Sequence, residues 1–138
     1  MDQDIRIAMI VNPALPLGLL SNTVSAVSIG LGAKFPFLAG DRLKDRNGLE
    51  VDISSNRPVP VLQADPDALR EIMMKATKEP ASCAVVIYPA FARSLHSYSD
   101  YEAEFPNRDL SGEIIDGIGL AGPAKWVKSL TGSLKLLR

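Results

Sequence analysis

The chain has 138 residues, of which 46% are hydrophobic, and its 15 lysines and arginines nearly balance its 16 aspartates and glutamates. This size and composition fit one folded domain and exclude a disordered chain. The net charge of −1 gives no overall attraction to nucleic acid or to an acidic membrane, so we expect neither as a partner.

Cysteine usage and the N-terminal residues indicate where the protein resides. Cys83 is the only cysteine, which excludes an internal disulfide and fits a reducing compartment. The first residues are acidic where a signal peptide would be basic, and prolines, serines and Asn22 interrupt the apolar stretch 15–33, which argues against a membrane span. We expect a cytoplasmic protein with a single domain, residues 1–138.

The first part of the chain predicts a strand, a loop and a helix. Residues 5–11 form an apolar run that is typical of a mostly buried strand. Residues 12–18 contain two prolines and therefore form a loop. Residues 19–33 follow helical spacing. One face of this helix is apolar (Leu20, Val24, Val27, Leu31) and the adjacent face is small (Ser21, Ser25, Ser28, Gly32).

A polar region comes next. Asn47-Gly48 is a turn signal, so we expect a hairpin flanked by Leu43 and residues 49–51. Residues 59–62 resemble a strand, but Pro60 cannot donate a ladder hydrogen bond, which predicts a position at the edge of the sheet.

The clearest helix is predicted over residues 66–78. Asp65 is a favourable N-cap, Pro66 suits the first helical position, and Pro80 closes the helix. The predicted buried stripe consists of Leu69, Ile72, Met73 and Ala76.

The second half alternates between strand and helix patterns. Residues 81–88 predict a central strand covered on both faces, and residues 91–105 predict a helix with Leu95, Tyr98 and Phe105 facing inward and Arg93 outward. A last strand is expected over residues 113–120 and a last helix over residues 123–130. This alternation indicates an α/β layer fold.

The C-terminal stretch carries a family resemblance. It reads Gly-Ile-Gly-Leu-Ala-Gly-Pro from Gly117, and after a short helix it ends in Thr131-Gly132 and Leu-Lys-Leu. Type 2 peptidyl-tRNA hydrolases end similarly, and the whole chain resembles a bacterial family catalogued as domain of unknown function 2000, which is grouped with that fold. The resemblance implies a three-layer α/β/α sandwich with a mixed four-stranded sheet, and it allows a homodimer.

The chain departs from those hydrolases where their chemistry lies. Those hydrolases carry lysines beside the glycine of the first loop and a histidine in the following helix. In this chain Gly18 is flanked by leucines, and neither a lysine nor a histidine occurs before Lys34. A phosphate-binding cluster needs cations, and an ester hydrolase needs a base or an activated nucleophile. We therefore expect the fold without the activity.

The loop after the first strand is the best candidate for a ligand site. It joins the carboxyl end of a strand to a helix N-terminus, where free N–H groups favour an anion or a carbonyl, and it is otherwise apolar. An unidentified small molecule is the expected partner. The predicted ligand-binding residues are Asn12, Pro13, Gly18, Ser21, Asn22 and Phe91.

Two functions follow from these residues, and they leave open whether the protein is an enzyme. The first is a small-ligand-binding or regulatory domain. The alternative is a divergent hydrolase, acting on an ester or a peptidyl-tRNA-like substrate, with His96, Asp100 and Ser21 as catalytic residues. His96 is the only histidine and has Asp100 four residues later, although a lone helical histidine is more often a surface residue.

No cofactor or metal ion is expected. Gly117, Gly119 and Gly122 match the spacing of a dinucleotide fingerprint, but the segment after Gly122 is short and has no acidic residue, so the glycines indicate close backbone packing instead. One histidine, one cysteine and scattered carboxylates do not form a metal-binding pattern.

Overall fold

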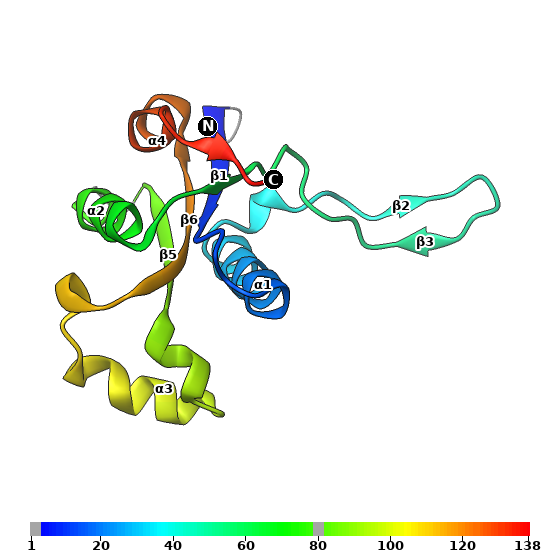
Figure 1. Cartoon of the computed structure of the whole chain (residues 1–138). Coiled ribbons are helices and arrows are strands. Elements are labelled where there is room, and N and C mark those ends of the chain that lie inside the picture. The colour runs from blue at the N-terminus through cyan, green and yellow to red at the C-terminus, as the bar shows by residue number, and fades with distance from the viewer. Residues whose placement is uncertain (1–3, 79–81) are drawn as a thin grey trace.

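Helices cover both faces of a mixed sheet in the computed structural model, which describes residues 4–78 and 82–138 (Figure 1). The strands of this sheet are β1 (Ile5–Val11), β4 (Val61–Gln63), β5 (Ala84–Pro89), β6 (Ile115–Pro123) and β7 (Lys135–Leu136). Their order is β5-β6-β1-β4-β7. β6 runs antiparallel to β5 and β1, β4 runs parallel to β1, and β7 runs antiparallel to β4.

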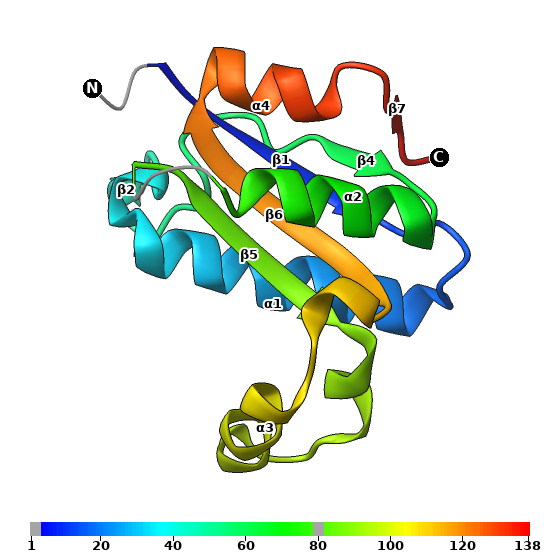
Figure 2. The same ribbon diagram turned by 90° about the vertical axis from the view of Figure 1, so that its left-hand side faces the viewer.

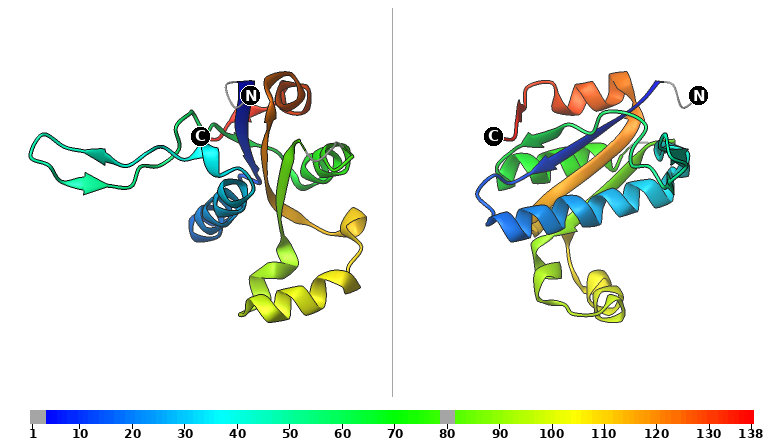
Figure 3. Two further views of the ribbon diagram at one scale, coloured as in Figure 1. Left: turned by 180° about the vertical axis from the view of Figure 1, so that it is seen from behind. Right: turned by 90° about the vertical axis from the view of Figure 1, so that its right-hand side faces the viewer.

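The helices form the outer layers. α1 (Leu17–Lys34) crosses one face, α2 (Pro66–Ala76) and α4 (Ala124–Thr131) cover the other, and α3 (Tyr98–Glu104) lies beyond the end of the sheet (Figures 2 and 3). Short 3-10 helices span Pro36–Leu38, Ala90–Ser94, Phe105–Asn107 and Leu110–Gly112. Among the described residues, none of the helices combines the length and the apolar character needed to span a membrane.

The predicted four-stranded sheet has five strands. The additional strand, β7, contains two residues, and it is held by hydrogen bonds from the Gln63 side chain to the Leu136 carbonyl (2.9 Å) and from Leu137 N–H to the Val61 carbonyl (2.8 Å). Two residues are too few to show a strand periodicity in the sequence. Because β7 pairs with β4, the expected edge position of residues 59–62 was wrong, and Pro60 immediately precedes the strand.

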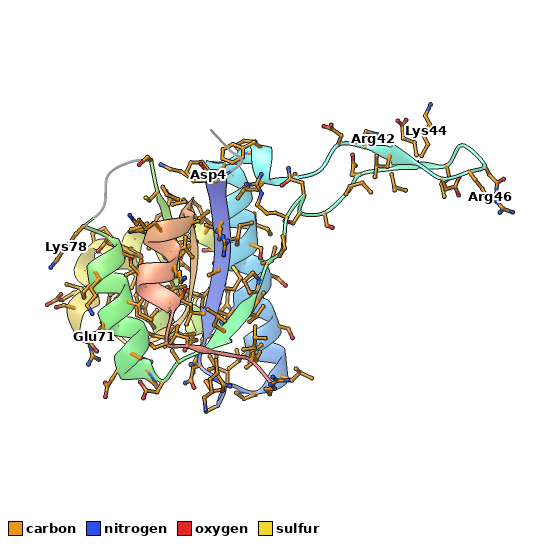
Figure 4. The ribbon with its side chains drawn as sticks, turned by 90° about the horizontal axis from the view of Figure 1, so that it is seen from above. Asp4, Arg42, Lys44, Arg46, Glu71 and Lys78 are labelled. Carbon is orange, nitrogen blue, oxygen red and sulfur yellow. The ribbon has the colours of Figure 1, made fainter. Side chains whose placement is uncertain are left out.

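The predicted hairpin is confirmed and projects from the body as an arm, formed by β2 (Leu43–Lys44) and β3 (Glu50–Val51) (Figure 4). Gly48 has a φ of 87°, a left-handed conformation that favours glycine. The Asp45 carboxylate accepts hydrogen bonds from the N–H groups of Asn47 (2.8 Å) and Leu49 (2.9 Å), which closes the turn.

The predicted helix after Asp65 is also confirmed. The Asp65 carboxylate accepts a hydrogen bond of 2.8 Å from Ala68 N–H, as expected for an N-cap. All members of the predicted apolar stripe are buried, namely Leu69, Ile72, Met73 and Ala76. Pro80, the predicted stop, and Ala81, the predicted start of the next strand, lie outside the described residues.

Several expectations in the second half were wrong. β5 lies at the edge of the sheet and not in its centre, although α1 and α2 pack against its two faces, which accounts for its unbroken apolar sequence. The expected helix over residues 91–105 is broken at 95–97, where Ser97 accepts a hydrogen bond from Asp100 N–H and starts α3. Tyr98 was expected to face inward but is 73% exposed.

The centre of the sheet has a face of small residues that receives α1. Gly117 and Gly119 of β6 lie under Thr23, Val27 and Leu31, the buried residues of that helix. A Cβ atom on Gly117 would lie 2.5 Å from Thr23 Cγ2, and one on Gly119 would lie 2.3 Å from Val27 Cγ1. α1 therefore packs almost directly on the backbone of β6.

The same packing explains the glycine motif that resembled a nucleotide fingerprint. All three glycines belong to β6, and a Cβ atom on Gly122 would lie 2.6 Å from Cε3 of Trp126. Helix side chains thus fill the space in which a pyrophosphate would approach the backbone.

Substitution of Gly119 tests this contact. Gly119→Ala is expected to lower the free energy of unfolding by about 1–3 kcal/mol, because Val27 must move and carry α1 away from the sheet. Urea denaturation measures the effect. Gly32→Ala is the matched control within α1: its Cβ would have no neighbour within 4 Å, so it should stabilise the helix by up to about 1 kcal/mol. Equal destabilisation by both substitutions would contradict close packing at Gly119.

Candidate functional site

An open cavity of about 580 Å³ lies between α1 and the segment that follows β5. We call it the tyrosine cavity, because Tyr88, Tyr98 and Tyr101 all line it. The remaining lining residues come from α1 (Ala26, Val27, Ile29, Gly30), from β5 (Val86, Ile87) and from the segment between β5 and α3 (Ala92, Leu95, His96, Ser97). The cavity is therefore mainly apolar, and its lining includes three phenols, one imidazole and one aliphatic hydroxyl.

Neighbouring side chains that do not line the cavity hold Tyr88 and Tyr101 in place. The Asn22 side chain, on α1, donates a hydrogen bond of 3.2 Å to the Tyr88 hydroxyl. The ring of Tyr101 packs against Phe91 and Phe105, with centroids 5.8 and 5.5 Å apart. Burial, and to a lesser extent the neighbouring Tyr88 and Tyr98, raise the pKa of the Tyr101 phenol. This hydroxyl therefore stays protonated, and able to donate a hydrogen bond, throughout the neutral range.

A buried ion pair fixes the segment that follows β5. The Asp116 side chain is 1% exposed and accepts two hydrogen bonds from Arg93, one of them from Nε at 2.6 Å and the other from Nη2. The hydrogen bonds to Asp116 raise the pKa of the Arg93 guanidinium, and Tyr88 adds to the shift. This pair ties the 3-10 helix Ala90–Ser94 to the start of β6, so the wall of the cavity is anchored to an interior strand of the sheet.

Sequence reasoning missed this pair. Arg93 was expected to face solvent on a helix, and Asp116 was not singled out. A signal was present, because Asp116 interrupts an apolar strand, and a carboxylate at such a position needs a partner once it is buried.

The predicted catalytic residues are only partly brought together. His96 lines the tyrosine cavity beside Ser97, but it precedes α3 and does not share a helical face with Asp100. Within the described part of the chain, no hydrogen bond or ion pair joins His96 to Asp100. Ser21 is exposed on α1 and is not among the residues that line this cavity. A catalytic role for these three residues stays a prediction.

The predicted ligand-binding residues fall into two groups. Asn22 and Phe91 support the cavity through Tyr88 and Tyr101. The other four, Asn12, Pro13, Gly18 and Ser21, do not line it, and their role stays a prediction. In the loop, Asn12 Oδ1 accepts a hydrogen bond from Ala14 N–H (3.0 Å), and Asn12 N–H donates to the Asp116 carbonyl (3.2 Å).

Further hollows lie elsewhere on the described part of the chain. An almost wholly apolar cavity of about 460 Å³ lies between α1 and the base of the arm, lined by residues that include Leu31, Leu38 and Ile53. A groove of about 330 Å³ lies between β1 and α4. In residues 4–78 and 82–138, no three histidine, cysteine or acidic side chains gather closely enough to hold a metal ion.

Comparisons with known proteins identify a family and a shared fold. A family model described as "Protein of unknown function (DUF2000)" matches residues 5–138. No curated protein matches the chain at a significant level. The chain is similar to the solved structure of a protein of unknown function from Agrobacterium tumefaciens strain C58, with a TM-score of 0.87 and 21% identity over 96% of this chain and 97% of that chain. This likeness shows a shared fold.

The anchoring role of the ion pair can be measured. Arg93→Gln is expected to lower the free energy of unfolding by about 1–3 kcal/mol, because it leaves the buried Asp116 carboxylate without its charged partner. The partial exposure of Arg93 keeps the effect below that of a fully buried pair. The control is Arg70→Gln, which breaks an exposed ion pair with Asp67. It should change the free energy of unfolding, measured by urea denaturation for both variants, by less than about 0.5 kcal/mol. Similar effects of the two substitutions would contradict the anchor.

Proposed function

The chain belongs to the DUF2000 family of proteins of unknown function, and on that premise we propose that it is a small-ligand-binding or regulatory domain whose ligand occupies the tyrosine cavity. The single observation that carries the proposal is that one mainly apolar cavity includes several polar groups in its lining. Ligand sites usually have this composition, with apolar walls and a few groups that orient the ligand.

The size and lining of the cavity favour a planar, partly apolar molecule. Its volume of about 580 Å³ lies within the range of roughly 300–1,000 Å³ that is common for small-molecule sites. Tyr88 and Tyr101 contribute aromatic rings and hydroxyl groups to the lining, and Ala26 and Gly30 contribute small residues from α1. A ligand ring would stack on the phenols while its polar substituents bond to their hydroxyls or to His96.

Charge argues against peptidyl-tRNA as the natural ligand. No lysine or arginine occurs in residues 12–33, which include the loop and most of the helix where the hydrolases place their basic residues. The cations needed to offset a phosphate backbone are missing there.

We also propose that residues 1–138 form one domain on a peptidyl-tRNA hydrolase II-like scaffold of bacterial origin. Helices on both faces of a mixed sheet and the similar C-terminal sequence support the scaffold, and the likeness to an Agrobacterium protein supports the origin. The free thiol of Cys83 supports a cytoplasmic location.

A divergent hydrolase is the second candidate function. The observation that favours it is the presence of His96 and Ser97 in the lining of one cavity, since a nucleophilic hydroxyl needs a base within reach. The Ser97 hydroxyl already accepts a hydrogen bond from Asp100 N–H, as the cap of α3. In the described part of the chain, no hydrogen bond joins this hydroxyl to His96, so the binding function is the better supported one.

A homodimer is proposed from the arm. Leu43 lies directly across from Val51, and Leu49 is on the same face of the hairpin, with exposed fractions of 58%, 47% and 65%. An isolated two-stranded hairpin is marginally stable in water, so this apolar face needs cover. Ile53 continues that face into the apolar cavity beside α1. A second copy can supply the cover, because a twofold interface buries the same patch on both chains.

Binding in the tyrosine cavity is tested with a library of small aromatic fragments. Fragments should shift the amide NMR signals of residues 26–30 and 95–101, and Tyr98→Ala should weaken their binding about five- to tenfold by removing a ring from the rim. Tyr98 is largely exposed, so this variant should fold normally. Met74→Ala, an exposed site on α2 across the sheet, is the control that should leave binding unchanged.

Two results would count against the binding proposal. One is the absence of any saturable shift at these residues. The other is turnover of a simple ester, such as p-nitrophenyl acetate, that is lost in His96→Ala, which would support the hydrolase.

The dimer is tested by sedimentation equilibrium. Leu49→Glu is expected to shift the protein from dimer to monomer, because it places a charge in the apolar face of the arm without disturbing the folded body. Lys44→Gln, on the opposite face of the hairpin, should leave the dimer intact. A monomer for the unaltered protein at high concentration would contradict the proposal.

A further inference from the structure

The groove between β1 and α4 is lined by three cationic side chains. Arg6 comes from β1, and Lys125 and Lys128 come from α4. The volume is about 330 Å³, and the apolar part of the lining includes Ala8, Leu62 and Val127. We call this feature the basic groove.

The fold brings these cations together from distant parts of the sequence. Arg6 pairs with Gly122 of β6, just before α4 begins, and it shares a strand face with Ala8, which packs in the core beneath α2 and α4. Lys125 and Lys128 are three residues apart on α4 and are therefore neighbours on its surface. A β1 side chain and two helix side chains thus border one hollow.

The cations have no acidic counterpart in the groove. None of the residues that line it is acidic, and in the described part of the chain none of the three cations forms an ion pair. The sequence from Gly117 to the end contains four lysines and arginines and no aspartate or glutamate. Arg6, Lys125 and Lys128 thus give this hollow a local excess of positive charge, even though the whole chain has a net charge of −1.

Helix α4 adds to this potential. It begins after Pro123 with no side chain capping its first N–H groups, and its first turn carries no acidic residue. Unsatisfied N–H groups at a helix start favour an anion, although they only supplement the three cations.

We propose that the basic groove binds a small phosphate monoester, with the phosphate between Arg6, Lys125 and Lys128 and the organic part against the apolar lining. The guanidinium of arginine matches two phosphate oxygens, and the lysines supply point charges from the other side. The small volume favours a small molecule over a nucleic acid strand. The groove lies on the opposite face of the sheet from the tyrosine cavity. Phosphate binding in the groove can therefore be tested independently of ligand binding in the tyrosine cavity.

The probe for this site is n-butyl phosphate, followed by amide NMR at low ionic strength. We expect saturable shifts at residues 6–8 and 124–131, with tighter binding than inorganic phosphate because the alkyl chain contacts Leu62 and Val127. Arg6→Gln and Lys128→Gln should each weaken binding by at least about tenfold, since each removes a charged hydrogen-bond donor. Added salt should weaken it as well.

Two control variants, one that retains the charge in the groove and one outside the groove, separate loss of the binding charge from other effects of substitution. Lys128→Arg should bind within about threefold of the unaltered protein, and Lys75→Gln, on α2 outside the groove, should bind equally well. Absence of saturable shifts in the groove, or equal affinity in Arg6→Gln and Lys75→Gln, would overturn the proposal. It would also be overturned if a single-stranded RNA oligonucleotide bound there far more tightly than the monoester.

Discussion

The close approach of α1 to β6 is the contact on which the rest of the structure depends. Gly117 and Gly119 leave no side chain between the strand and the helix, so Thr23 and Val27 rest on the strand itself. Protein interiors are packed too densely to absorb an added methyl group at such a place without movement. The position of α1 is thereby fixed over the middle of the sheet, and every group that α1 carries is fixed with it.

That position creates the wall of the tyrosine cavity. With α1 held against β6, Asn22 reaches the Tyr88 hydroxyl at the end of β5, and Ala26 and Gly30 face the hollow beside the same strand. The opposite wall depends on β6 too, because Asp116 of that strand holds Arg93. β6 therefore positions both walls of the cavity. Its glycines receive α1 on one face, and its Asp116 carboxylate holds Arg93 near the start of the strand.

The sequence predicted the elements better than their arrangement. Local signals such as the Asp65 cap and the Gly48 turn led to correct elements, because each depends on neighbours within a few residues. The edge position of β5 and the fifth strand β7 depend on pairing between distant residues, which composition does not reveal. Ser97 broke the expected helix because its hydroxyl caps α3, and a cap of this kind competes locally with helix continuation.

The candidate sites show the same division between local and distant information. Asn22 and Phe91 were predicted as ligand-binding residues, a role that stays a prediction, and in the structure they contact Tyr88 and Tyr101. The sequence did not predict the basic groove for a different reason. The net charge of −1 is a sum over the whole chain, whereas ligand binding depends on the local electrostatic field. Arg6 and Lys128 are separated by most of the sequence, and antiparallel pairing of β1 with β6 is what places them at one hollow. A nearly neutral chain can therefore present a cationic groove on one face of its sheet and an aromatic-lined cavity on the other.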